Sequence, residues 1–123
     1  MSERGGTPVT RRAYVVEADV RLPDDADPAI LGTTVTTALC GAATHAGPCR
    51  WPHHNDHERV GQRIRFRTLF VVDPKDEPEV RRRIETALRS DEEEFTVIAT
   101  RTRDVAPSER ELAQRLSRTP RPT

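Results

Sequence analysis

Residues 63–72 read RIRFRTLFVV, and the alternation of side chains along this stretch decides the fold. Ile64, Phe66 and every second residue after them are apolar or small, whereas arginines occupy positions 63, 65 and 67. Strict alternation with a period of two is typical of a β-strand that buries one face. The stretch therefore predicts a strand that belongs to a sheet with a core on one side and an arginine-bearing face on the other.

Three further strands are predicted on either side of this stretch. Residues 12–22 alternate in the same way, with apolar side chains on one face and Glu17 and Asp19 on the other. Residues 95–103 are rich in Thr, Val and Ile, which favour strands. The segment before Gly61 is less clear: residues 56–60 could form a short edge strand, or Trp51 and Pro52 could lead into a short helical turn. Gly61 and Gln62 suit a hairpin turn.

Apolar residues at helical spacing predict two helices and a short third one. The first spans residues 28–43, where Asp27 and Pro28 provide an N-cap and a first-turn proline. The second begins near residues 76–79, where Asp76 and Glu79 have the spacing of a capping box. Four-residue spacing also predicts ion pairs along it, Glu77 to Arg81, Glu79 to Arg83 and Glu85 to Arg89. A last capping box at residues 108–111 opens the short C-terminal helix.

The order strand, helix, weak strand, strand, helix, strand is that of an α+β fold. We expect the split β-α-β arrangement of ferredoxin-like domains, with a four-stranded antiparallel sheet and two helices on one face. The predicted organisation is a disordered arm (residues 1–11), the α+β domain (12–104) with a Cys/His-rich loop (40–57), the C-terminal helix (105–118) and a disordered tail (119–123). A fold of this kind hosts many functions and indicates none of them.

The composition bounds the function without naming it. The chain has 123 residues, 20 basic and 20 acidic, so its formal net charge is zero. This argues against a nucleic-acid binder held by an overall positive field. The N-terminus has no apolar stretch typical of a signal peptide, and no run of about 20 apolar residues could span a membrane. We therefore expect a soluble cytoplasmic protein that binds neither nucleic acid nor membrane and keeps its cysteines reduced.

The chain gathers all of its histidines and cysteines between positions 40 and 57. These six side chains are the candidate ligands of zinc or another transition metal: Cys40, His45, Cys49, His53, His54 and His57. Zinc prefers thiolate and imidazole ligands at four tetrahedral positions. Cys40 falls almost opposite the apolar stripe of its helix, which a buried structural cysteine would not do. The leading hypothesis is a Cys/His loop that binds metal in a structural or accessory role.

Other interpretations of the loop remain open. The histidines could cap an ordinary loop, and a disulfide between Cys40 and Cys49 is geometrically possible although unexpected in a reducing compartment. Cys49 could also be a catalytic nucleophile activated by a nearby histidine, with Asn55 or Asp56 as orienting group. The sequence does not decide whether the protein is an enzyme, although it favours a protein without catalytic activity. Trp51 is expected to act as a packing lid over the loop.

The arginine-bearing face could bind phosphate or RNA, but it lacks aromatic side chains on which bases could stack. Carboxylates of residues 12–22 are expected to face Arg63, Arg65 and Arg67 and to neutralise them through cross-strand pairs. Val15, Leu69 and Val71 leave the same face partly apolar. This mixed surface predicts a homodimer through the open sheet face, and a metal-free interaction module of that kind is the second functional hypothesis. Any other protein partner is unknown.

Overall fold

The computed structural model describes residues 11–41, 50–90 and 94–119, which fold into one α+β unit. Its elements, in chain order, are β2 (Arg12–Arg21), α1 (Ala29–Cys40), β3 (His53–Val60), β4 (Arg63–Val72), a 3-10 turn (Pro74–Asp76), α2 (Glu77–Ser90), β5 (Thr96–Asp104), a second 3-10 turn (Pro107–Glu109) and α3 (Arg110–Ser117). None of the helices in the described ranges is long and apolar enough to cross a membrane. Nearly all of the predicted arm and of the predicted tail lies outside these ranges.

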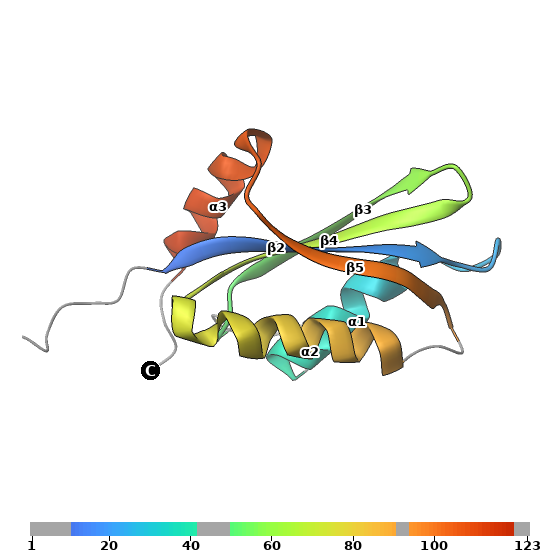
Figure 1. The fold of residues 1–123 in the computed structure, drawn as a ribbon, viewed down its shortest axis with the longest axis horizontal. Coiled ribbons are helices and arrows are strands. Elements are labelled where there is room, and N and C mark those ends of the chain that lie inside the picture. The colour runs from blue at the N-terminus through green and yellow to red at the C-terminus, as the bar shows by residue number, and fades with distance from the viewer. Residues whose placement is uncertain (1–10, 42–49, 91–93, 120–123) are drawn as a thin grey trace, which may run out of the picture.

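The strands form one four-stranded antiparallel sheet in the order β3-β4-β2-β5 (Figure 1). The two strands that α1 connects, β2 and β3, are therefore parallel, with β4 between them. The two strands that α2 connects, β4 and β5, are likewise parallel, with β2 between them. This confirms the predicted α+β class and its split β-α-β connections. The predicted neighbourhood of β2 and β4 is confirmed as well, with Glu17 opposite Arg67 and Asp19 opposite Arg65.

The main core lies between the sheet and the two long helices, which cover the same face (Figure 1). Even-numbered side chains of β2 and β4 point to this side, as the period-two pattern predicts. The helices contribute three buried positions each, at a spacing of four residues. The core consists of Val16, Ala18, Val20, Leu31, Val35, Leu39, Trp51, Ile64, Phe66, Phe70, Val72, Val80, Ile84, Leu88 and Phe95. Trp51 is only 4% exposed and belongs to the main core, whereas residues 42–49 of the loop that it was predicted to cover lie outside the described residues.

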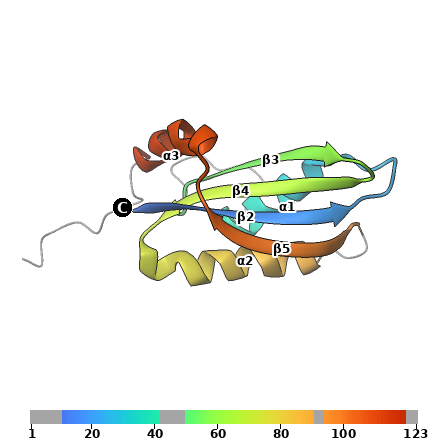
Figure 2. The ribbon, with the colours of Figure 1, turned by 45° about the horizontal axis from the view of Figure 1, so that its top comes forward.

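The third helix, α3, lies on the opposite face of the sheet (Figures 1 and 2). Ala113 of α3 packs with Val15, Leu69 and Val71 in a second, smaller core. These three sheet residues are the apolar patch from which the sequence predicted a homodimer, and each is no more than 3% exposed. The patch is thus covered within the chain itself, which removes the reason for that prediction. The homodimer remains a prediction without a surface to support it.

The first helix is shorter than predicted. Its first turn is capped as expected, since the backbone N–H of Ala29 donates to Oδ1 of Asp27 at 3.0 Å. It ends at Cys40 because Gly41 adopts a left-handed conformation with φ of 81° and donates its N–H to the carbonyl of Thr37. Glycine takes this conformation without the steric cost that a Cβ would impose.

The weak strand proves longer than the sequence indicated. It runs from His53 to Val60 along the edge of the sheet and pairs with β4 over its whole length. Gly61 and Gln62 form the predicted hairpin turn, with Gly61 at φ of 64°. The alternative of a helical turn after Trp51 and Pro52 is therefore wrong, and the histidines of this segment lie on an extended backbone.

Candidate functional site

The structure does not bring the predicted metal ligands together. Cys40 is the last residue of α1, and three histidines lie on β3, at positions 53, 54 and 57. His45 and Cys49 lie outside the described residues, so the candidate nucleophile Cys49 has no described geometry. The extended backbone of β3 then decides which of the described histidines could meet.

Successive side chains of a strand point to opposite faces of the sheet. His54 pairs in register with Leu69 and so lies on the α3 face, whereas His53 and His57 lie on the helix face, opposite Phe70 and Phe66. Four residues of strand separate His53 from His57 by about 13 Å. Zinc–nitrogen bonds are about 2.0–2.1 Å long, so these two imidazoles cannot hold the same ion.

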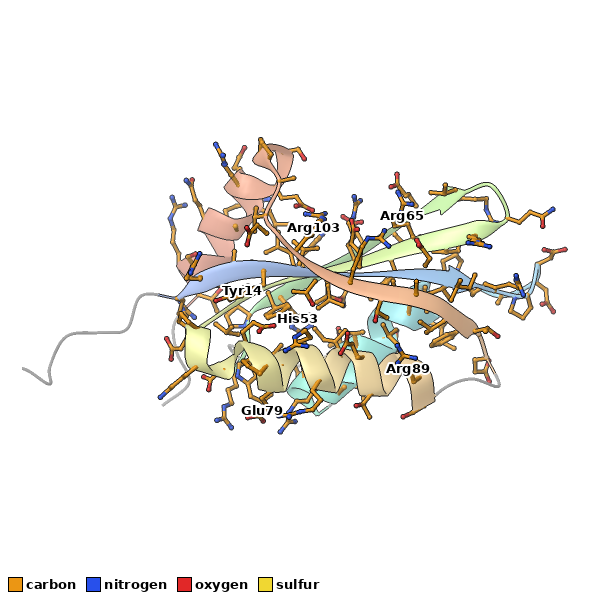
Figure 3. The ribbon with its side chains drawn as sticks, viewed as in Figure 1. Tyr14, His53, Arg65, Glu79, Arg89 and Arg103 are labelled. Carbon is orange, nitrogen blue, oxygen red and sulfur yellow. The ribbon has the colours of Figure 1, made fainter. Side chains whose placement is uncertain are left out.

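The imidazole of His53 is occupied by hydrogen bonds within the protein. Its Nδ1 lies 3.0 Å from the carbonyl oxygen of Trp51 and its Nε2 lies 3.2 Å from Oγ1 of Thr36. A carbonyl oxygen only accepts, so Nδ1 carries the proton and Nε2 accepts from the Thr36 hydroxyl. Neither nitrogen is left to bind a metal. Figure 3 shows His53 on the side of the sheet that faces the helices.

Cys40 is disulfide-bonded, and a disulfide sulfur is not the thiolate that zinc requires. Although the helical pattern placed Cys40 almost opposite the apolar stripe of α1, it is partly buried and packs against the main core. Among residues 11–41, 50–90 and 94–119, no three His, Cys, Asp or Glu side chains lie together in an arrangement that could hold a metal ion. The predicted function of a zinc-binding Cys/His loop is therefore wrong.

A hydrogen-bonded polar chain between α1 and the sheet replaces the expected metal site. Thr68, which is fully buried, donates to Oδ1 of Asn55 at 2.8 Å. Nδ2 of Asn55 donates to the carbonyl of Gly32 at 3.2 Å and to Oγ1 of Thr36 at 3.0 Å. Thr36 in turn donates to His53. The chain satisfies polar groups that would otherwise be buried without partners, and it fixes α1 to the edge strand.

The arginine-bearing face of the sheet is largely neutralised by ion pairs, as predicted. Asp19 is bound by Arg65 at 3.3 Å and by Arg101 at 3.2 Å (Arg65 is labelled in Figure 3). Burial disfavours the charged form of Asp19, but hydrogen bonds from these two arginines outweigh it and lower its pKa below the usual value. Arg67 pairs with Asp56 of the edge strand at 2.7 Å.

The face has a second cluster of charges that the sequence did not predict. Glu17, only 8% exposed, receives Arg101 at 2.7 Å and Arg103 at 3.1 Å, and both arginines come from β5. Arg103 also binds Glu109, at the start of α3, at 2.8 Å. The sequence signal for these pairs was the alternation of arginines along β5, which matches the alternation of carboxylates along β2. The cluster joins the last strand and α3 to the sheet.

The neutralisation stops at the end of the sheet where β2 ends and the β3–β4 hairpin turns. A pocket of about 410 Å³ lies there, lined by Arg21, Leu22, Asp24, Arg59, Gly61, Gln62 and Arg63. We call it the arginine pocket. In the described part of the chain, its three arginines form no ion pair and no hydrogen bond through their side chains. The prediction that Arg63 would be neutralised across the strands is thus wrong.

The strand register explains how this positive end arises. Val20 and Ile64 form the last pair between β2 and β4, and Arg21 and Arg63 are the next residues outward on the two strands, where both line the pocket. Like charges that line the same pocket repel each other. Arg59 pairs with Ile64 and leaves from the other face, which places a third guanidinium at the same end. Three unpaired guanidiniums around one pocket form a site suited to an anion.

Comparisons with known proteins give information on the fold and on no other property of the protein. No family model matches the chain, and no curated protein matches it in sequence. Among solved structures, the chain is similar to the de novo designed protein Foldit4, with a TM-score of 0.51 and 13% sequence identity. The match covers 76% of this chain and 99% of the designed one. At this identity the likeness shows the fold, and it lends no support to a metal-binding function.

Proposed function

We propose that the protein binds a small phosphate-bearing ligand in the arginine pocket. The observation that carries this proposal is a difference between two positions along the same two strands, β2 and β4, in how their charges are paired. Asp19 and Arg65 neutralise each other two residue pairs inward, whereas Arg21 and Arg63 at the end of the sheet have no carboxylate partner among the described residues. A bound anion would supply the missing negative charge.

The geometry favours phosphate over a single carboxylate. A guanidinium offers planar, bidentate donors that match phosphate oxygens, and phosphate has enough oxygens to receive several guanidiniums at once. The pocket volume of about 410 Å³ lies within the usual range for small-molecule sites. The larger cavity, of about 570 Å³ beside α2, is a weaker candidate because its Arg83 is already paired with Glu79 and stacked over Trp51.

Isothermal titration of the purified protein with inorganic phosphate and with ethyl phosphate tests the proposal. Arg21→Gln and Arg63→Gln should each weaken binding by at least about tenfold, since one charge-assisted hydrogen bond contributes about 1.5–3 kcal/mol. Arg110→Gln removes an exposed arginine that lies outside the pocket and has no ion pair within the described residues, so it serves as the matched control. Unchanged affinity in both pocket variants would exclude this site. Binding of an oligonucleotide in the absence of small-phosphate binding would instead indicate a nucleic-acid surface.

A further inference from the structure

We propose that the ligand of the arginine pocket is a phosphomonoester that also carries an ammonium group. This inference rests on the proposed function and narrows its ligand class. It comes from Asp24, the single carboxylate among the residues that line the pocket.

Asp24 remains separate from the three arginines around it. Elsewhere on the sheet, Asp19 and Asp56 form ion pairs with the nearest arginines, at 3.3 Å and 2.7 Å. In the described part of the chain, the side chain of Asp24 makes no ion pair and no hydrogen bond. The pocket therefore presents positive and negative groups that do not neutralise each other. A ligand with both charges would satisfy both.

The charges of the pocket match those of such a ligand. Three guanidiniums and one carboxylate leave the lining with two net positive charges. A phosphomonoester carries about −1.5 to −2 charges at neutral pH, which suits the arginines, and an ammonium group supplies the cation that Asp24 lacks. A ligand with phosphate alone would leave Asp24 facing an anion. That arrangement is unfavourable because like charges repel.

Leu22 adds an apolar surface to the lining of the pocket. It lines the pocket and also packs against the main core, so it presents an apolar surface in a fixed position. A short aliphatic linker between phosphate and ammonium would lie against it. The expected ligand is therefore small, of the size and chemistry of an amino-alcohol phosphate.

Calorimetric titration with phosphoethanolamine and with ethyl phosphate tests the ammonium requirement, because the two compounds share the phosphate and the two-carbon chain. The wild-type protein should bind phosphoethanolamine at least tenfold more tightly. Asp24→Asn should abolish this preference and leave the affinity for ethyl phosphate equal or higher. Asn is well accepted in turns, and an unchanged thermal midpoint would verify the fold of the variant. Asp25→Asn, which changes the neighbouring exposed carboxylate outside the pocket lining, should keep the preference.

Each outcome separates this inference from the proposed function. Equal affinity for the two compounds, with both weakened by Arg21→Gln, would overturn the ammonium requirement and leave the phosphate site intact. Binding of neither compound would overturn both. Sedimentation of the protein with phosphatidylethanolamine vesicles, and not with phosphatidylcholine vesicles, would show that the ligand is a lipid headgroup and would overturn the phosphomonoester.

Discussion

The guanidinium of Arg103 donates two parallel hydrogen bonds to the carboxylate of Glu109, at 2.8 and 3.0 Å. Glu109 also accepts the backbone N–H of Ala106 at 2.8 Å. Because Arg103 lies on β5 and Glu109 immediately precedes α3, this bidentate pair fixes the helix to the sheet where the chain reverses direction. Such paired, charge-assisted bonds are among the stronger polar contacts of a protein.

Glu109→Gln should destabilise the protein at neutral pH by about 1–2 kcal/mol, since it removes the charge from this pair. Hydrogen bonds from Arg103 hold the pKa of Glu109 below its ordinary value of 4.5. The stabilisation is therefore complete above about pH 4.5 and is lost as the pH falls through the lower, folded-state pKa. Denaturant unfolding at pH 7 and pH 3 should show the wild-type advantage shrinking toward zero. Glu111→Gln, at an exposed site on α3, should show no comparable pH-dependent loss.

Asn55→Ala should lower the free energy of unfolding by about 1–3 kcal/mol, because it leaves the buried hydroxyl of Thr68 without its acceptor. It also removes both donors that Asn55 offers to α1. Hydrogen exchange should therefore rise in the first half of α1 more than in α2. His54→Ala, on the exposed opposite face of β3, is the matched control and should leave both quantities close to wild type. Equal effects of the two variants would contradict a specific role of the polar chain.

Ala113→Asp should detach α3 from the sheet, because it places a carboxylate among Val15, Leu69 and Val71. Gln114→Asp adds the same charge to the exposed side of the helix and should be tolerated. Limited proteolysis should cleave the first variant near α3 much faster than the second. Light scattering then tests the predicted homodimer: self-association of the Ala113 variant alone would show that α3 keeps the chain monomeric by covering the patch. A dimer of the wild-type protein would show that another surface is used.

Cys40 should resist alkylation under non-reducing conditions and react only after reduction, since it is disulfide-bonded. The sequence holds just one other cysteine, so peptide mapping should link Cys40 to Cys49. Mass spectrometry of the intact, alkylated protein measures this directly. A chelator should leave the thermal midpoint unchanged, whereas a reductant should lower it. Quantitative alkylation without reductant would instead support the expectation that both cysteines stay reduced in a cytoplasmic protein.

The sheet and its helices were predictable because their patterns are local. Alternation in residues 12–22 and 63–72 and the i, i+4 pairs of the second helix need no knowledge of tertiary structure, and the pairs of Glu77 with Arg81 and Glu79 with Arg83 are present. The third predicted pair, Glu85 with Arg89, is not found within the described residues. Glu85 instead accepts a hydrogen bond from Thr100 of β5. A contact from a distant strand thus replaced a local one.

The candidate site was predicted wrongly because clustering in sequence is not clustering in space. His53, His54 and His57 are close along the chain, but the pleat of β3 directs His54 to one face and separates the others along the second. Thr68 was assigned to the buried face correctly, yet its need for a partner, which Asn55 meets, follows only from the pairing of β3 with β4. The position of Arg21 and Arg63 likewise follows from the register, because both lie just outside its last pair, Val20 with Ile64.

The polar composition of the edge strand has a consequence for solubility. An exposed edge offers free backbone donors and acceptors to any passing strand, and unprotected edges promote aggregation. Almost every side chain of β3 is charged or polar, and Asp56, Glu58 and Arg59 are charged residues of its second half. A second molecule that added a strand there would have to bring its own side chains against these charges. The charged side chains of β3 therefore act as a barrier to uncontrolled extension of the sheet.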